Sequence, residues 1–293
     1  MKYLHYIALS LSMVLWTSSL NAQEEDDGSW WREQMKDLVY SPRYFGPSAF
    51  PMPELRSGKV STRYEIEARG EYHYYTGDVT TDLYLRTLLP FVRGRAGLEV
   101  SFIVLEKYKL TEATRVERHA SLTECPSNER YNGDVVISAF YQVLESEKWF
   151  DAMISLNLKT ASGGRLVDAR FTDAATYWMD ATVGKDLAKS YDGAYSLRMQ
   201  AMAGFYCWMT NDIVHRQNDA ILYGVGFTGI LDKVTLSSNL SGFNGYDHNG
   251  DNPLQLRNSA QFDFKNNIIS FRYAHGMKDC LYDTYSLGYI RCF

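Results

Sequence analysis

Residues 62–75, TRYEIEARGEYHYY, decide the fold. One alternate set of side chains is Tyr64, Ile66, Ala68, Gly70, Tyr72 and Tyr74, and the other is Arg63, Glu65, Glu67, Arg69, Glu71 and His73. Because successive side chains of a β-strand point to opposite faces, this period of two predicts a strand with one apolar, aromatic face and one charged face. In a soluble sandwich the charged face would meet bulk water. In a membrane barrel it would meet an aqueous lumen, and the tyrosine face would meet lipid.

The same alternation recurs along the rest of the chain. It gives twelve candidate strands, an even number, as closed single-chain barrels require. These are residues 62–75, 79–91, 98–110, 135–144, 153–160, 176–185, 196–209, 220–231, 234–243, 254–265, 268–273 and 282–293. The sequence therefore predicts an all-β fold, a membrane-spanning antiparallel up-and-down β-barrel of about twelve strands.

The lengths of the connections between these strands support the same fold. Barrels of this class have short periplasmic turns and longer outer loops. Alternate connections are indeed short, at 92–97, 145–151, 232–233 and 266–267, and the others are mostly longer, at 111–132, 161–175, 244–253 and 274–281. Two connections depart from the rule, since Thr76-Gly77-Asp78 is a tight outer connection and 186–195 is a long inner one. A soluble β-sandwich is not expected to alternate short and long connections in this way.

The N-terminal region is predicted to contain a secretory signal and a lead into the barrel. Lys2 precedes an apolar run over 6–16 that is too short to span a bilayer as a helix, and we place cleavage after Ala22. We therefore divide the chain into a signal peptide (1–22), a periplasmic N-terminal segment (23–59) and the barrel (60–293). The middle segment contains Trp30-Trp31 and three prolines within 47–53. It is expected either to enter the periplasmic mouth as a plug or to form a loose lead.

The last strand carries a second targeting feature. Tyr285, Leu287, Tyr289 and Phe293 share a face, and the chain ends in Phe293. This resembles the C-terminal signal that bacterial outer-membrane proteins present to the barrel-insertion machinery. That machinery is therefore an expected partner during assembly, and the expected location is the bacterial outer membrane, with its lipid around the barrel.

Four short segments resemble one protein family. They are YFGPSAFPMPEL (44–55), LKTASGG (158–164), RFTD (170–173) and YAHG (273–276). They resemble porin-like outer-membrane β-barrel proteins of Bacteroidota, a family whose function is poorly defined. The resemblance spans nearly all of the chain after the signal peptide. It implies an outer-membrane barrel and gives neither a substrate nor functional residues.

Composition excludes some functions and leaves others open. The formal net charge is −5 and no dense basic block is present, which argues against nucleic acid as a partner. The four cysteines are widely spaced without a metal-ligand pattern, so we expect no metal and no cofactor. Cys125 and Cys280 both fall in predicted outer loops, where a disulfide is allowed, but spacing alone does not show that the loops meet.

The predicted inward faces collect charges of both signs. The pore-lining candidates are Arg63, Glu65, Glu67, Arg69, Glu71, Asp82, Tyr84, Arg86, Lys107, Lys159, Arg198, Arg257 and Asp263. One interpretation is a structural set of ion-paired ladders across neighbouring strands. The other is a pore whose slight basic excess favours anionic or sugar solutes. Inward Tyr84, Phe140, Tyr206 and Trp208 are either sugar-stacking platforms or packing in a constricted barrel.

Two short motifs resemble a catalytic site and a calcium-binding site. His119-Ala120-Ser121 resembles the His-x-Ser spacing of the outer-membrane phospholipase, with Asn132 to orient the histidine, but it lies in a charged loop. Asp247-His248-Asn249-Gly250-Asp251 places oxygen ligands two residues apart, as calcium loops do, but glycine and asparagine also favour a surface turn. The sequence therefore predicts no catalytic residue and no metal ligand.

The leading hypothesis for function is a porin-like outer-membrane channel for small hydrophilic solutes, anionic or sugar in character. The alternative is a non-conducting structural or accessory barrel of an envelope complex, plugged by its N-terminal segment. A third hypothesis is a barrel hydrolase of the phospholipase type, although we expect the protein not to be an enzyme.

Overall fold

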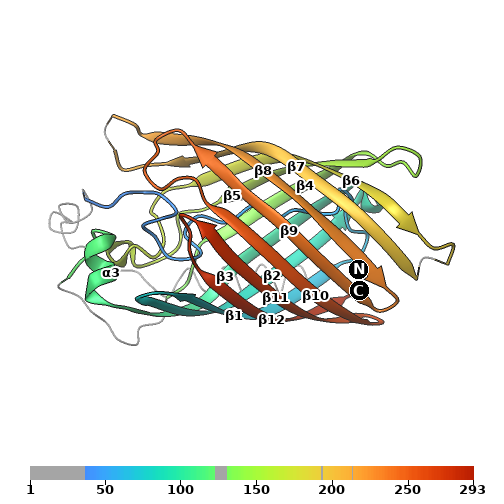
Figure 1. Ribbon diagram of the computed structural model, residues 1–293, viewed down its shortest axis with the longest axis horizontal. Helices are drawn as coiled ribbons and strands as arrows, with labels where there is room; N and C mark the ends of the chain where they lie inside the picture. The colour runs from blue at the N-terminus through green and yellow to red at the C-terminus, as the bar shows by residue number, and fades with distance from the viewer. Residues whose placement is uncertain (1–36, 123–130, 193, 213) are drawn as a thin grey trace. The chain divides into compact units, whose positions relative to one another are not determined.

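The computed structural model describes residues 37–122, 131–192, 194–212 and 214–293. In this part of the chain the strands form a closed barrel whose neighbouring pairs are antiparallel, with β1 paired to β12 (Figure 1). The predicted twelve-strand barrel is confirmed. Its strands are β1 (Glu65–Tyr75), β2 (Asp78–Phe91), β3 (Ala96–Leu110), β4 (Val135–Leu144), β5 (Asp151–Lys159), β6 (Thr176–Lys189), β7 (Tyr195–Met209), β8 (Gln217–Leu231), β9 (Val234–Gly245), β10 (Leu254–Phe264), β11 (Asn267–Lys278) and β12 (Asp283–Cys292).

The two faces of the strands distinguish a membrane barrel from a soluble sandwich. In β1, Arg69 and His73 are each 5% exposed, whereas Tyr72 and Tyr74 are 41% and 48% exposed. The buried face is thus the charged one, the reverse of a water-soluble sheet. Other strands add large apolar side chains to the exposed face, including Ile137, Ile154, Leu156, Met179, Ile221, Val225, Phe227 and Leu287. This outer surface matches the lipid-facing band of a transmembrane barrel.

The two ends of the barrel have different connections. At the end where β1 begins and β12 finishes, the connections are short and one holds the 3₁₀ helix η1 (Val92–Gly94). We call this the turn end. The opposite end, the loop end, has longer connections that hold α3 (Glu112–Glu117) and η2 (Leu166–Asp168). By the rule for this class the turn end faces the periplasm and the loop end faces outward. No helix among the described residues is long and apolar enough to cross a membrane.

Both exceptional connections have a structural reason. Thr76 and Gly77 make a two-residue turn, and Gly77 has φ +87°, a backbone conformation that glycine adopts without strain. The predicted long inner connection is shorter than expected because β6 continues to Lys189, which leaves only residues 190–194 before β7.

Candidate solute pathway in the barrel lumen

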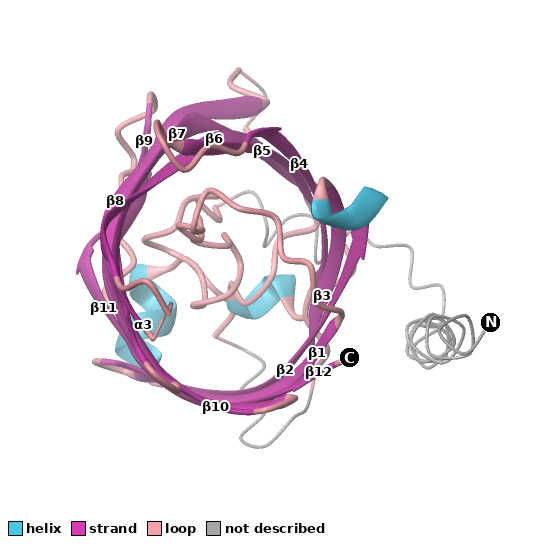
Figure 2. Cartoon of the chain, turned by 90° about the vertical axis from the view of Figure 1, so that its right-hand side faces the viewer, coloured by secondary structure: helices cyan, strands magenta, loops and turns pink. Residues whose placement is uncertain are grey.

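Residues 37–61 lie inside the barrel rather than in its wall. Figure 2, a view along the barrel, shows loop segments within the ring of strands. Near the beginning of this segment, Trp208 Nε1 donates to the Tyr40 carbonyl at 2.7 Å and Asn211 Nδ2 donates to the Leu38 carbonyl at 3.0 Å. Trp208 lies near the outer end of β7 and Asn211 in the loop after it. The described segment therefore starts at the loop end.

The segment then crosses the lumen to the turn end. Ser241 Oγ donates to the Pro53 carbonyl at 3.0 Å, and Arg198 Nε donates to the Ser57 carbonyl at 2.8 Å. The Val60 amide finally donates to Gln142 Oε1 at 2.7 Å, close to the inner end of β4. The sequence predicts either a plug at the periplasmic mouth or a loose periplasmic lead for this region. The described part reaches much further, across the whole length of the lumen.

Aromatic side chains fill the lumen near the loop end. Phe45 and Phe50 from the segment pack in one apolar cluster with Tyr206, Trp208 and Phe243 of the wall. The Tyr206 and Phe243 rings are stacked at 4.2 Å, and Phe50 meets Trp208 edge-on at 5.6 Å. Tyr206 and Trp208 are both 0% exposed, so they pack against the segment and offer no open face for a sugar ring.

Two cavities lie on either side of a charged constriction. One, of about 190 Å³, is toward the loop end and includes His73 and Thr284 in its lining. The other, of about 300 Å³, is toward the turn end and includes Lys59 and Ile290. Five residues line both cavities, and we call them the arginine constriction: Glu54, Arg56, Arg69, Arg257 and Arg272.

The arginines of the constriction are paired unequally. Arg272 Nη2 lies 2.6 Å from Glu54 Oε1, the contact that holds the segment to the wall here. Arg69 contacts two carboxylates of its own strand, Glu67 at 2.8 Å and Glu71 at 3.0 Å. Arg257 donates to Gln255 Oε1 at 2.8 Å, and among the described residues it makes no ion pair.

A dense ion-pair network continues toward the turn end on the wall formed by β1–β3. Arg86 contacts Glu65 and Glu67 at 2.7 Å each and Glu99 at 2.9 Å. Glu99 also meets Arg56 at 2.8 Å, whose guanidinium lies 4.2 Å from the Phe140 ring centre. These side chains neutralise one another and are fixed by several partners each, which matches the ladder interpretation of the sequence.

A second buried network closes the loop end. The Asp78 carboxylate forms ion pairs with Arg118 at 2.8 Å and with Arg170 at 2.7 Å, and Arg170 also pairs with Glu106 at 2.8 Å. Arg118 further donates to the Tyr282 hydroxyl at 2.7 Å. The side chains of Asp78 and Arg170 are 0% exposed, so this network holds the loops over the lumen and contacts no open water.

Most of the predicted pore-lining residues point inward, in three groups. Around the constriction and the turn-end network lie Glu65, Glu67, Arg69, Glu71, Tyr84, Arg86 and Arg257, with Asp82 beside His73. Two others are buried in local pairs, Lys159 with Asp134 and Arg198 with Asp151. Arg63 and Asp263 pair at 3.2 Å on the rim of the turn end, where the side chain of Arg63 is 46% exposed.

The prediction for Lys107 is wrong. Leu83 pairs with Leu105 and Tyr84 pairs with Ile103, so Val104 is an extra residue in β3. Such a bulge exchanges the two faces of the strand beyond it. The side chain of Lys107 is consequently exposed on the outer face, whereas Glu106 is 1% exposed and faces inward.

Several residues that line or close the lumen are not among those predicted from the sequence. Glu54 and Arg56 belong to the irregular segment, where no periodicity shows which side chains face the pathway. Arg272 could have been found, because it alternates with Ser270 on the inward face of β11. Arg118 and Arg170 lie in loops, and nothing in their local sequence indicates burial.

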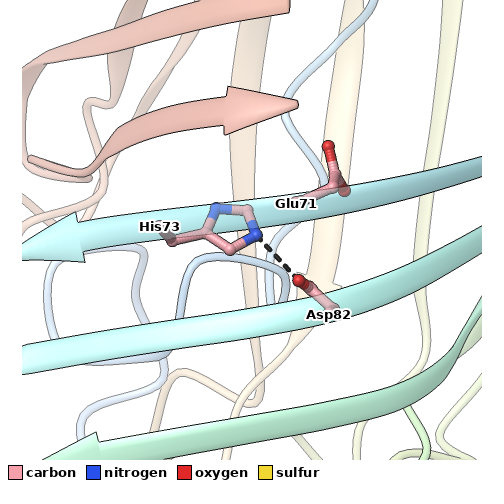
Figure 3. Close-up of side chains that lie close together, drawn as sticks. All are labelled: Glu71, His73 and Asp82. Carbon is pink, nitrogen blue, oxygen red and sulfur yellow. Dashed lines mark hydrogen bonds and ion pairs between the residues drawn. The ribbon is translucent and has the colours of Figure 1, made fainter. Parts of the chain in front are cut away.

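Glu71, His73 and Asp82 are the described acidic and histidine side chains spaced closely enough to suggest a metal site (Figure 3). Their ligand atoms lie within 4.8 Å of one another. However, His73 Nε2 is 3.0 Å from Asp82 and its Nδ1 is 2.8 Å from Thr284 Oγ1, so both ring nitrogens have partners. Arg69 also contacts Glu71. The positive charge of Arg69 beside the Glu71 carboxylate disfavours binding of a metal cation there. The three side chains are better described as part of a hydrogen-bond network.

The phospholipase-like motif lacks the geometry that its hypothesis requires. His119 and Ser121 follow α3 and lie in no strand, so a spacing of two does not place them on one face. His119 is exposed, with its ring 6.5 Å from that of Tyr44, whereas Ser121 is buried. Asn132 donates to the Ser162 carbonyl at 3.2 Å.

The calcium-like loop and the cysteines add no site. Asp251 is 0% exposed and accepts from Asn218 at 2.9 Å and from the Asp247 amide at 3.0 Å, which closes the loop on itself. Cys280 is buried at the loop end. The predicted signal peptide over 1–22 and Cys125 lie outside the described residues, and with Cys125 the question whether it pairs with Cys280.

Taken together, an apolar exterior, twelve antiparallel strands and a polar interior define an integral outer-membrane β-barrel. Solved structures agree. The chain is similar to an outer membrane channel from Pseudomonas putida F1, at 14% identity over 84% of this chain and 98% of that chain, with a TM-score of 0.55. It is also similar to the KdgM porin in complex with disordered oligogalacturonate, at 13% identity over 78% and 99% of the two chains, with a TM-score of 0.47.

The similarity to the Pseudomonas putida F1 channel supports the barrel fold and identifies no solute. No family model matches the chain, and no curated protein matches it. The resemblance to Bacteroidota proteins stays a prediction.

Proposed function

We propose that the protein is an outer-membrane channel for small hydrophilic solutes, with a preference for anions, whose lumen is narrowed by residues 37–61. The observation that carries this proposal is the pair of cavities that meet at the arginine constriction. Open space on both sides of one charged constriction is what a selective pore requires. Four of the five constriction side chains are arginines, which favours negatively charged solutes.

Conduction then depends on the segment. Its described contacts include hydrogen bonds to its carbonyls, the aromatic cluster near the loop end, and ion pairs of Glu54 with Arg272, Arg56 with Glu99 and Lys59 with Asp151. An irregular segment held in this way can shift more easily than a wall strand, because it takes part in no ladder of backbone hydrogen bonds. We propose that such shifts open the pathway.

The test is electrical recording of the purified protein in planar lipid bilayers. The wild type should give discrete conductance steps. Phe50→Ala removes a ring that packs on Trp208, at a cost of about 3–5 kcal/mol for a buried phenylalanine, and should increase the open time. Phe227→Ala, a matched change at a side chain that is 47% exposed on the outer surface, should leave the currents unchanged. Absence of steps in both the wild type and Phe50→Ala would exclude a channel.

That negative result would favour the second candidate, a non-conducting accessory barrel of an envelope complex. The filled loop end is the observation behind it, since Phe45, Tyr206, Trp208, Leu222 and Phe243 are all 0% exposed there. The cavities favour the channel, because a barrel with a purely structural role has no need of a hydrated interior.

A further inference from the structure

On the β9–β11 side of the constriction, the negative charge comes from the segment and not from the wall. Wall strands β9, β10 and β11 line the turn-end cavity with Arg257, Arg272 and the neutral polar residues Ser237, Asn239, Ser259, Gln261 and Ser270. No carboxylate stands among these lining residues. Of the two guanidinium groups in this part of the wall, Arg272 is paired with the Glu54 side chain at 2.6 Å, and Arg257 makes no ion pair among the described residues.

Among the lumen carboxylates described above, Glu54 is the one held least firmly in place. Its side chain is 43% exposed, and one arginine holds it. Glu67, by comparison, contacts both Arg69 and Arg86 and is 5% exposed. Because Glu54 also sits on a segment without strand pairing, its carboxylate can leave the wall without breaking the barrel.

The electrostatics at Glu54 agree with this arrangement. Its position deep in the barrel raises the pKa of the carboxyl, but Arg272, followed by Arg257, Arg69 and Arg56, outweighs burial and holds the pKa well below its usual range. The site thus stabilises a carboxylate in its charged form. A carboxylate on a solute would meet the same guanidinium groups.

We propose that Arg257 and Arg272 form a binding site for small hydroxylated carboxylates, such as uronic acids, and that the Glu54 carboxylate occupies this site until the solute displaces it. This rests on the proposed channel function and names its solute class. The solute carboxylate accepts hydrogen bonds from the two arginines. The hydroxyl groups of the solute form hydrogen bonds with the serine, asparagine and glutamine side chains of the adjoining wall. The turn-end cavity of about 300 Å³ lies at the lower end of the roughly 300–1,000 Å³ range of ligand pockets.

Isothermal titration calorimetry of the full-length protein in detergent tests the site without requiring conduction. Glucuronate should bind, and glucose, its neutral counterpart, should bind at least about tenfold more weakly, because a hydrogen bond to a charged group is lost. Arg257→Gln should lower the affinity for glucuronate about tenfold. Glu54→Gln removes the competing carboxylate and should raise this affinity about tenfold.

The rim pair Arg63 and Asp263 supplies matched controls. Arg63→Gln and Asp263→Asn make the same charge changes away from the constriction, where Arg63 and Asp263 are 46% and 37% exposed, and should leave the affinity unchanged. Equal effects of Asp263→Asn and Glu54→Gln would show that only the net charge of the lumen matters, and would overturn the proposal. So would equal binding of glucose, or no binding of glucuronate by the wild type and Glu54→Gln.

Bilayer recordings separate the two proposals. Glucuronate should interrupt the current through the wild-type channel, and glucose should not. A channel that conducts but ignores glucuronate in both assays would refute the carboxylate site and leave the channel standing. Glucuronate binding by a barrel that never conducts would refute the channel and leave the site.

Discussion

Replacing Arg170 by alanine should strongly destabilise the barrel. The side chain is 0% exposed and makes three polar contacts: Nε to Glu106 at 2.8 Å, Nη1 to Asp78 at 2.7 Å and Nη2 to Thr80 at 2.8 Å. Asp78 keeps Arg118 at 2.8 Å as a second cationic partner. For Glu106 no other cation lies within 4.0 Å among the described residues, so the substitution leaves it buried and unpaired.

The magnitude follows from that remaining charge. Three hydrogen bonds to charged groups, at about 1.5–3 kcal/mol each, would overstate the loss because Asp78 stays paired. Removal of one partner from a buried ion pair costs about 3–5 kcal/mol, and this range applies to Glu106, whose side chain is 1% exposed. The free energy of unfolding of Arg170→Ala should therefore fall by about 3–5 kcal/mol.

Equilibrium unfolding in urea, with the barrel folded into lipid vesicles, measures this change. Arg63→Ala is the control, because its pair with Asp263 is exposed and should contribute at most about 1 kcal/mol. Adding Glu106→Gln to Arg170→Ala removes the unpaired charge and should recover part of the loss. If Arg170→Ala costs no more than Arg63→Ala, or if Glu106→Gln recovers nothing, the account of this network is wrong.

Three further predictions concern the lumen and its orientation. The Arg272 guanidinium and its neighbours outweigh burial and depress the pKa of Glu54, so their ion pair is fully present above the usual value of 4.5 and is lost only as the pH falls through the depressed value. The difference in conductance between the wild type and Glu54→Gln should therefore be constant from about pH 7 to pH 5, and a change in this difference near pH 6 would contradict this account. Modification of Lys107→Cys by a charged thiol reagent should leave the current unchanged, because Lys107 faces outward, whereas modification of Arg69→Cys should reduce it. Asp37→Cys, exposed near the loop end, should react with a membrane-impermeant maleimide on intact cells; reaction only after permeabilisation would refute the assigned path of the segment.

The barrel could be predicted from the sequence because its signal is local. A period of two in 62–75 needs no knowledge of partner strands, and the charged face is the same one that the structure buries. The bulge at Val104 is a feature that alternation within a single strand does not predict. Whether a residue is extra depends on the partner strand, β2, and nothing in β3 alone marks the exchange of faces that moves Lys107 outward.

The segment inside the lumen was beyond local analysis for a different reason. Tyr40 and Trp208 are separated by 168 positions in the sequence, and Ser57 and Arg198 by 141. Aromatic and proline residues in 37–61 indicated a packed structure but not the surface against which it packs. Consequently Glu54 and Arg56, the two segment residues at the constriction, had no sequence signal, whereas Arg69 and Arg257 were found from alternation in their own strands.

The unequal charge pairing of the wall determines where a solute would travel. Along β1–β3 each arginine already meets two or three carboxylates, as Arg86 does, so a passing anion would have to displace several partners at once. Along β9–β11 the polar lining is neutral except for Arg257 and Arg272, and Arg272 is paired with Glu54. A solute carboxylate that displaces Glu54 gives Arg272 a new acidic partner, so this arginine is not left buried and unpaired. If the protein is the proposed channel, we therefore expect an anionic solute to pass along the β9–β11 side of the barrel, where the Glu54 side chain of the segment would control its passage.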